Sequence, residues 1–337
     1  MKVIYLTDIH DDLKELRFII KNTEASLYII SGDIIYKAFY TEDKLYDFIG
    51  QQEYFYKKIK NENLNLTPFE LATEVVNSPN KFTDTELEYG ENYLDLFEQA
   101  VINMREKYMV INDLVDKYAQ AKTFFIPGNY DMNLDYTGLK DFNLHKKTLD
   151  FKGIRFSGYG GAPVATLGIP EQLAVHYNED KSQPVKKSEV YNFYMHEKPD
   201  VVVTHNPAYG TFDKLPGYGN VGSFGLREYI DKLSPALVLS GHMHEDYGLM
   251  KIQNSLCLNP SNFGRVISLL ENDLGGYYCS FELSKKNNTC NVDNFELLNL
   301  NEKKINKILA IKKNLDGKLE EKIFDENEFM ILGRFLR

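Results

Sequence analysis

Five short polar clusters along this chain carry the residue types that bind transition metals. Their donors are two aspartates, one asparagine and four histidines: Asp8, Asp33, Asn129, His10, His205, His242 and His244. Carboxylate, amide and imidazole groups without a thiolate suit Mn, Fe, Zn or Co better than Ca, and they exclude a cysteine-rich structural zinc site. Seven donors are too many for one four-coordinate ion. The set therefore predicts a centre of two metal ions that share a bridging carboxylate.

The elements that must position these donors are short, almost continuously apolar runs. They span residues 3–7, 27–31, 123–127, 200–204 and 236–240. Runs of this kind are typical of strands that are buried on both faces. A polar cluster follows each run directly, and ligands of open α/β sheets bind beyond the carboxyl ends of the strands. We therefore expect the five clusters to occupy equivalent positions at strand ends.

Helical spacing lies between these runs, at residues 11–22, 188–197 and 222–233, and the alternation predicts an α/β fold. Residues 37–90 are long for a connection within such a fold. Thr67 and Glu70, on either side of Pro68, form the pattern of a capping box, so we expect a mostly helical insertion in this region. A further helix is expected at residues 92–118.

The chain changes character after residue 248. Short alternating runs at residues 249–253, 255–258, 265–270 and 277–283 predict antiparallel hairpins. Residues 284–290 are polar and are interpreted as a linker, and residues 301–314 have apolar residues at helical spacing. We therefore expect one domain at residues 1–284 and an extension at residues 285–337, which packs on it with a strand and a helix.

Composition limits the classes of function. The chain has 337 residues, a formal net charge of -10 and no basic run, so we expect no nucleic acid as a partner. Three cysteines without a paired spacing indicate a reducing compartment. The first residues lack the pattern of a secretory signal, and no apolar run is long enough to span a bilayer. These features predict a cytoplasmic protein with no membrane partner, and they leave the oligomeric state undetermined.

The polar clusters, in this order, resemble the motifs of the calcineurin-like metallophosphoesterases. The matching residues are Asp8-x-His10, Gly32-Asp33, Gly128-Asn129, His205 and Gly241-His242-x-His244. The turn at Asn259-Pro260-Ser261 is similar to one that is common in the family, and the segments 207–210, 222–223 and 241–245 look like those of a small-molecule subgroup. The resemblance covers residues 1–283, and it implies a four-layer α/β/β/α sandwich of two mixed sheets flanked by helices.

The resemblance also implies roles for the donors. Asp8, His10 and His244 would bind the first metal; Asn129, His205 and His242 would bind the second. Asp33 would bridge the two ions together with a solvent hydroxide, which would attack phosphorus. The expected activity is hydrolysis of a small phosphodiester or phosphomonoester, with two divalent ions as cofactors and Mn favoured over Fe, Zn and Co. Two such ions outweigh the two carboxylates and a hydroxide, so the centre would attract a phosphate ester despite the acidic surface.

One position departs from the family pattern. Many relatives have a histidine after the Gly-Asn pair, where this chain has Tyr130. A phenol can donate a hydrogen bond, but it does not act as an imidazolium at neutral pH. Tyr130 joins Asp33, Asn129 and His205 as a candidate catalytic residue. We expect slow turnover of substrates with poor leaving groups.

Alternatives remain open for several residues and for the function. His145, His176 and His196 each lie outside a metal motif, and we interpret them as ordinary core or surface residues. Asp131 is interpreted as an orienting or capping residue, and Asn206, Tyr209 and Arg265 are candidates for substrate contact. A nuclease of the same fold and a metal-bound protein-interaction scaffold are the two alternative functions.

Overall fold

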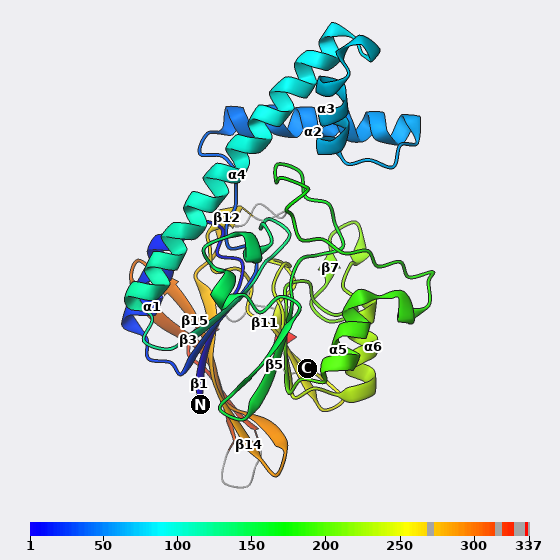
Figure 1. Ribbon diagram of the computed structural model, residues 1–337. Coiled ribbons are helices and arrows are strands. Elements are labelled where there is room, and N and C mark those ends of the chain that lie inside the picture. The colour runs from blue at the N-terminus through cyan, green and yellow to red at the C-terminus, as the bar shows by residue number, and fades with distance from the viewer. Residues whose placement is uncertain (268–272, 314–318, 327–333, 336–337) are drawn as a thin grey trace.

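Two seven-stranded mixed sheets form the centre of the molecule (Figure 1). The computed structural model describes residues 1–267, 273–313, 319–326 and 334–335. The first sheet has the order β17 (Leu319–Ile323), β16 (Lys304–Lys313), β15 (Thr289–Asn301), β14 (Tyr277–Lys286), β1 (Lys2–Leu6), β2 (Leu27–Ser31), β3 (Lys122–Ile126). The second has the order β18 (Arg334–Phe335), β10 (Gly248–Ile252), β11 (Ser255–Asn259), β9 (Leu237–Leu239), β6 (Val201–Thr204), β5 (Ile154–Tyr159), β4 (Lys147–Phe151). Two small hairpins pair β7 (Lys214–Leu215) with β8 (Gly219–Asn220) and β12 (Val266–Ile267) with β13 (Asp273–Leu274).

Three apolar clusters hold the layers together. One lies between the sheets, where alternate side chains such as Val3 and Tyr5 of β1 meet Val201 and Val203 of β6. A second covers the outer face of the first sheet with α1 (Leu13–Asn22) and α4 (Asp84–Tyr118). A third covers the outer face of the second sheet with α5 (Glu189–Glu197) and α6 (Phe224–Leu233). The predicted α/β/β/α sandwich and the five predicted buried strands are confirmed.

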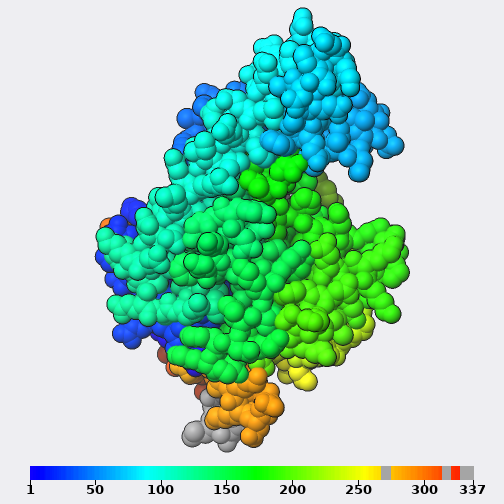
Figure 2. Space-filling view, in the orientation of Figure 1, coloured from blue at the N-terminus to red at the C-terminus, as the bar shows by residue number. Residues whose placement is uncertain are grey.

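The insertion is helical, as predicted. It contains α2 (Glu42–Glu62) and α3 (Pro68–Asn77), and it projects from the body of the molecule at the top of Figure 2. Thr67 and Glu70 form the predicted capping box, in which the Glu70 amide donates to Thr67 Oγ1 and the Thr67 amide donates to the Glu70 carboxylate. Asn63 ends α2 in a left-handed conformation, which asparagine tolerates better than most residues.

The helix predicted at residues 92–118 begins earlier, at Asp84. Thr83 and Glu86 form a second capping box that the sequence analysis overlooked. Gly90 lies inside the helix, where a side chain would meet Val75 and Val76 of α3 at about 3.1–3.2 Å. This glycine therefore allows α3 and α4 to pack closely, and it does not mark the end of the insertion. The resulting helix runs from the insertion down past α1 (Figure 1).

The predictions for the segment after residue 283 were wrong in two places. Residues 284–290 are no linker, because they form the end of β14, a turn and the start of β15. Within residues 301–314, the described part forms strand β16 and no helix. These strands continue the first sheet beyond β1, so both sides of the proposed boundary at residue 284 belong to one sheet. Of the strand predicted at residues 265–270, β12 covers Val266–Ile267, and residues 268–270 lie outside the described part.

The strand directions bring the carboxyl ends of both sheets to one side. In the first sheet β1, β2 and β3 run parallel, and in the second β5, β6 and β9 run parallel. The loops after β1, β2, β3, β6 and β9 are the five polar clusters of the sequence. Within the described residues, no helix combines the length and the apolar character needed to cross a membrane.

Candidate metal centre

Two groups of donor atoms lie at the carboxyl ends of the strands, where the two sheets meet. Asp8, His10 and His244 form the first group, and Asp33, His205 and His242 form the second; within each group the ligand atoms lie within 4.8 Å of one another. Each group draws on both sheets, because β1 and β2 supply the aspartates whereas β6 and β9 supply three of the histidines. The structure thus brings together six of the seven predicted donors, and Asn129 joins the second group.

In the first group, two imidazole nitrogens face a carboxylate. His10 Nε2 lies 3.1 Å from His244 Nε2, and Asp8 Oδ1 lies 3.4 Å from His244 Nε2 and 3.9 Å from His10 Nε2. The other oxygen of Asp8 accepts from Thr7 Oγ1 at 2.6 Å and from the His242 amide at 3.0 Å. Asp8 is therefore held by the chain mainly through Oδ2; Oδ1 also accepts from the His242 amide at 3.2 Å and is turned toward the two histidines.

In the second group, His205 is the central side chain. Its Nε2 lies 3.3 Å from Asp33 Oδ1 and 3.1 Å from Asn129 Oδ1. Its Nδ1 lies 2.9 Å from the Ser31 carbonyl, which can only accept, so Nδ1 carries the proton in this contact. The lone pair of neutral His205 is then on Nε2, which faces the carboxylate and the amide oxygen.

The spacing of these atoms fits a cation in each group. Two ligands that each lie about 2.1 Å from one ion are separated by roughly 3–4.2 Å, which matches the observed contacts. Without a cation, the unprotonated Nε2 of neutral His205 and the Asn129 amide oxygen would face each other as two acceptors in a buried site. Such a pair needs either a shared proton or a positive ion. The donor set of carboxylates, imidazoles and one amide suits divalent transition metals.

The surroundings shift the pKa values of the donors in directions that follow from burial and charge. Burial lowers the pKa of His10 and of His242 to about 4, so both imidazoles are neutral and able to donate a lone pair. Burial alone would also lower the pKa of His205, but the Asp33 carboxylate raises it to about 9. Burial opposes ionisation of Asp8, yet the hydrogen bond from His244 and the neighbouring imidazoles lower its pKa well below the ordinary value. A cation in the site would take over the role of the proton on His205.

Several donors are held in a backbone conformation that L-residues rarely adopt. The φ angles are +53° at Asp8, +47° at His10, +44° at Asp33 and +68° at His242. Left-handed conformations of such residues cost about 1–3 kcal/mol each and persist only where the surrounding structure enforces them. Gly128 shows the crowding, because a Cβ atom there would lie 2.0 Å from Asp33 Oδ1. The backbone is therefore strained at the very positions that carry the donors.

Four side chains hold the donors in place, and only two of them stood out in the sequence. Asn259, in the turn noted above, donates to the carbonyls of Gly241 and Met243 on the loop that carries His242 and His244. Asp131 accepts from the amides of Ile34, Ile35 and Gly128 and from Tyr108 on α4, which confirms its orienting position beside Asp33 and Asn129. Thr7 and Thr166 were missed. Thr166 Oγ1 accepts from Asn129 Nδ2 at 2.8 Å, so Oδ1 of that amide is left for the metal site.

A pocket of about 580 Å³ opens onto both groups, and we call it the metal cleft. His10, Asp33, Asn129, His242 and His244 face it, while His205 is fully buried beneath. Its walls are mainly apolar or aromatic: Tyr36 and Tyr130 on one side, and Leu215, Tyr218 and Val221 from the β7–β8 hairpin and the residue after it. No lysine or arginine is among the described residues that line it. Positive charge for an anionic ligand of this cleft would therefore have to come from bound cations.

Tyr130 contributes to the site in two ways. Its amide donates to Asp33 Oδ1 at 2.9 Å, and its ring lies edge-on to His10 with centroids 6.1 Å apart. Burial and the Asp33 carboxylate raise the pKa of its phenol to about 12. The phenol is therefore a poor proton donor to a leaving alkoxide.

The remaining candidates divide between the cleft and other places. Asn206 lines the metal cleft, whereas Tyr209 stacks on Phe224 away from it. His145 is buried, and its Nδ1 accepts from the Gly160 amide at 2.8 Å. His196 is exposed and pairs with Glu197. His145 and His196 thus have partners within the chain, in agreement with their interpretation as ordinary core and surface residues.

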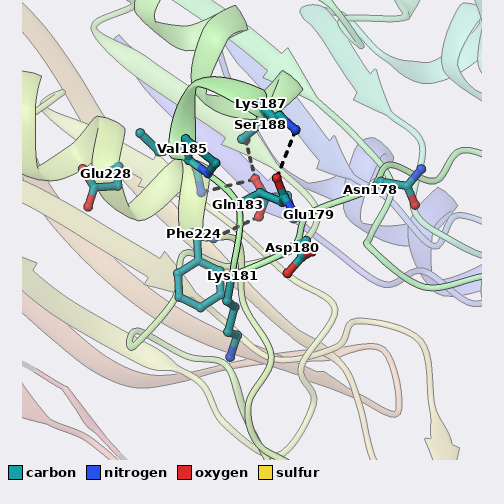
Figure 3. A pocket seen from close by; sticks show the side chains of 12 residues that line it. Asn178, Glu179, Asp180, Lys181, Gln183, Val185, Lys187, Ser188, Phe224 and Glu228 are labelled. Carbon is teal, nitrogen blue, oxygen red and sulfur yellow. Dashed lines mark hydrogen bonds between the residues drawn. The ribbon is translucent and has the colours of Figure 1, made fainter.

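A second hollow, of about 490 Å³, lies at the start of α6 around Glu179 (Figure 3). Glu179 accepts from Ser188 Oγ at 2.5 Å, Ser223 Oγ at 3.0 Å, the Phe224 amide at 2.9 Å and the Gly225 amide at 3.2 Å. A carboxylate of the chain therefore already occupies this helix N-terminus, and it fastens the loop before α5 to α6.

Comparison with known proteins gives one family. The model of the calcineurin-like phosphoesterase family matches residues 80–246. This span contains Asn129, His205, His242 and His244, while Asp8, His10 and Asp33 precede it.

Individual relatives are distant. The chain is 25% identical to the uncharacterized protein MJ1162 of Methanocaldococcus jannaschii over 160 residues, which are 44% of this chain and 70% of that protein. The crystal structure of TT1561 of Thermus thermophilus is 14% identical and covers 91% of this chain and 97% of its own, with a TM-score of 0.42. Wild-type Vps29 of Entamoeba histolytica, complexed with zinc, is 10% identical and covers 96% and 100%, with a TM-score of 0.37.

Proposed function

This chain belongs to the calcineurin-like phosphoesterase family, and from that premise we propose that it is a metal-dependent hydrolase of small phosphate esters, with phosphodiesters as its main substrates. The observation that carries the proposal is the pair of donor groups that face one cleft, each with a carboxylate and two histidines. A catalytically inactive member of such a family would be expected to lack some of these donors. All seven are present in this chain, and their spacing suits cations.

We propose that Asp33 bridges two divalent ions. Its carboxylate lies in the second group. Its charge also acts on His10 of the first group, where it opposes the effect of burial and raises the pKa of His10 more than any other charge does. When bound, the two ions would activate a water molecule and neutralise charge on the phosphoryl oxygens. Asp8, His10 and His244 would hold one ion, and Asn129, His205 and His242 the other.

The chain's own groups determine how the ester binds and leaves. The phosphoryl group would enter the metal cleft at its polar floor, and its organic groups would contact the apolar walls. A phosphodiester carries one negative charge and a phosphomonoester up to two. The described residues that line the cleft include Glu245 and no lysine or arginine, so the charge of a metal-loaded cleft would suit the diester better.

The test is hydrolysis of bis(4-nitrophenyl) phosphate by protein reconstituted with Mn²⁺, Zn²⁺ or Fe²⁺. We expect release of 4-nitrophenol that a chelator abolishes, and a lower kcat/KM for 4-nitrophenyl phosphate. Absence of hydrolysis in protein with bound metals would contradict the proposal and favour an interaction scaffold. Cleavage of plasmid or single-stranded DNA in preference to the small esters would favour a nuclease.

Tyr130 gives a sharper form of the test. Since its phenol is a weak acid, activity should depend steeply on the leaving group, with alkyl esters turned over far more slowly than 4-nitrophenyl esters. Tyr130→His should raise the rate for alkyl esters relative to 4-nitrophenyl esters, whereas Tyr130→Phe should change neither rate by much. If both variants leave the ratio of alkyl to aryl rates unchanged, the leaving group is not protonated from this position.

A further inference from the structure

A second pocket adjoins the metal cleft on the side of the insertion. It has a volume of about 520 Å³ and lies between α2 and the loop at residues 167–169, and we call it the cap pocket. Tyr36, Tyr130 and Val266 line both the cap pocket and the metal cleft. The rings of Tyr36 and Tyr130 are 6.1 Å apart, so together they form the partition between the two spaces. A molecule that binds at the metals can therefore extend past this pair into the cap pocket.

The lining of the cap pocket differs from that of the metal cleft. Leu45, Tyr46 and Ile49 of α2 offer it an apolar and aromatic wall, and Lys37, Glu42 and Arg265 lie around it. Lys37 pairs with Glu42 at 2.9 Å, so the three charged groups amount to one net positive charge. The metal cleft has no such basic group among its described lining residues. This pocket thus suits an apolar ring with polar or anionic substituents.

The loop that lines the cap pocket is fixed from the side of the insertion. Gln52 of α2 accepts from the Gly168 amide at 2.9 Å and donates to the Ile169 carbonyl at 3.0 Å. Glu171 accepts from the Phe69 amide of α3 at 2.8 Å and from the Tyr93 hydroxyl of α4 at 2.6 Å. All three helices of this region therefore hold the loop that lines the cap pocket. A pocket built by buried hydrogen bonds is preformed, which lowers the entropic cost of binding.

We infer that the cap pocket binds one of the two alcohol groups of a phosphodiester, and that this group carries a planar aromatic ring, as a nucleoside does. The inference rests on the proposed function. The other alcohol would lie against Leu215, Tyr218 and Val221, which line the metal cleft and not the cap pocket. Two organic groups on one phosphorus fit two apolar walls, one in each pocket, whereas a monoester would leave one wall without a partner. The insertion then selects the substrate, while the metals perform the chemistry.

The experiment compares esters that share one leaving group. Methyl 4-nitrophenyl phosphate, phenyl 4-nitrophenyl phosphate and thymidine 5′-(4-nitrophenyl phosphate) differ only in the retained alcohol, and all release 4-nitrophenol. Wild-type protein should have the highest kcat/KM for thymidine and the lowest for methyl. Tyr46→Ala should lower kcat/KM for the thymidine ester about tenfold and leave the methyl ester unchanged, because it removes an aromatic side chain on which the base can stack. Tyr46 is 64% exposed, so its removal should not unfold the protein.

Two further variants make the result specific. Ile49→Trp should fill the cap pocket and reduce activity on the phenyl and thymidine esters, with the rate for the methyl ester as the check on folding. Tyr136→Ala removes a tyrosine that is similarly exposed, at 57%, and lies in neither pocket, so it should change none of the three rates. Equal kcat/KM for the three esters in wild type, or equal loss on all three in Tyr46→Ala, would overturn the inference and leave the proposed hydrolase intact. Failure of wild type to hydrolyse any ester would overturn both.

Discussion

Two kinds of carboxylate in this molecule differ in their surroundings. Glu179 is half-buried at the start of α6, and Asp8 and Asp33 are buried just after strands β1 and β2. Glu179 accepts four hydrogen bonds, from two serine hydroxyls and two amides at the start of α6 (Figure 3). Asp8 and Asp33 each receive hydrogen bonds from the chain, and each also turns an oxygen toward histidine Nε2 atoms. The chain supplies only donors to Glu179, whereas Asp8 and Asp33 also face imidazole nitrogens, which can hold either a proton or a cation.

The difference separates a structural carboxylate from a candidate metal ligand. Where donors of the chain surround a carboxylate, it fastens two segments and needs no ion. Where its neighbours are other acceptors, a cation is the partner that completes the site. The backbone conformation supports the same distinction. Asp8 and Asp33 have positive φ angles, which are unfavourable for L-residues. The variants described next should distinguish the two kinds of carboxylate by their effects on activity, metal binding and stability.

Asp33→Asn should have the largest effect. An amide removes one negative charge from the second donor group and would offer only one oxygen to a bound ion. We expect kcat for bis(4-nitrophenyl) phosphate to fall by about a thousandfold or more, since stabilisation of charge by the metals contributes several kcal/mol. Circular dichroism should confirm that the variant is folded. A variant with near wild-type activity would show that Asp33 is not at the reacting centre.

Glu179→Gln should affect stability and leave activity unchanged. The side-chain amide would place an N–H₂ group opposite either the Phe224 amide, which donates to Oε2, or the Gly225 amide, which donates to Oε1. We expect a loss of about 1–3 kcal/mol in the free energy of unfolding, measured with urea. Glu228→Gln is the matched control, because this exposed glutamate lines the same hollow without these contacts. A change in metal content on Glu179→Gln would contradict the distinction between the two sites.

His145 extends the comparison to histidines, because its Nδ1 already accepts a hydrogen bond from the Gly160 amide. Burial lowers the pKa of His145 to about 4, below its value of about 6.5 in the unfolded chain. The unfolded state therefore binds more protons between these values, and stability falls as the pH drops from about 6.5 toward 4. At pH 5 the loss amounts to about 2 kcal/mol relative to pH 7. His145→Asn should lose correspondingly less stability between pH 7 and pH 5, and an unchanged pH dependence would mean that another group is responsible.

Thr166→Val should have the smallest effect, on metal affinity. The valine cannot accept from Asn129 Nδ2, so the amide is free to rotate and its Oδ1 is less often directed at the site. We expect about a tenfold weaker binding of one of the two ions, measured by titration with a chelator. Thr148→Val, which removes a hydroxyl paired with Ser157 in another part of the molecule, should leave the affinity unchanged.

The sequence predicted the donor groups because each donor follows a buried strand. Asp8, Asp33 and His205 could be placed beyond strand ends, and the parallel directions of β1, β2, β6 and β9 then bring them to one side. The supporting residues were harder to find. Thr166 lies in a long loop, and its contact with Asn129 depends on how the insertion holds that loop. The cap pocket likewise depends on contacts between Gln52 and a loop more than a hundred residues away.

The C-terminal strands show how a sequence pattern can mislead. Ile305, Ile308, Leu309 and Ile311 have helical spacing, yet they lie in β16. The pairing with β15 shifts at this point, since Leu297 pairs with Leu309 but Leu298 pairs with Lys307. Ile308 is the extra residue of this bulge. Ile305 therefore packs toward the helical layer, while Leu309 and Ile311 pack between the sheets, and the simple alternation of a strand is lost.

The most direct test of this account is the metal content of the purified protein, measured by elemental analysis after reconstitution and removal of free ions. We predict close to two transition-metal ions per chain in wild type, an unchanged number in Glu179→Gln and a sharp fall in Asp33→Asn. A wild-type protein that retains no such ion under any of these conditions would contradict the account, because its facing acceptors would then have no cation to join them.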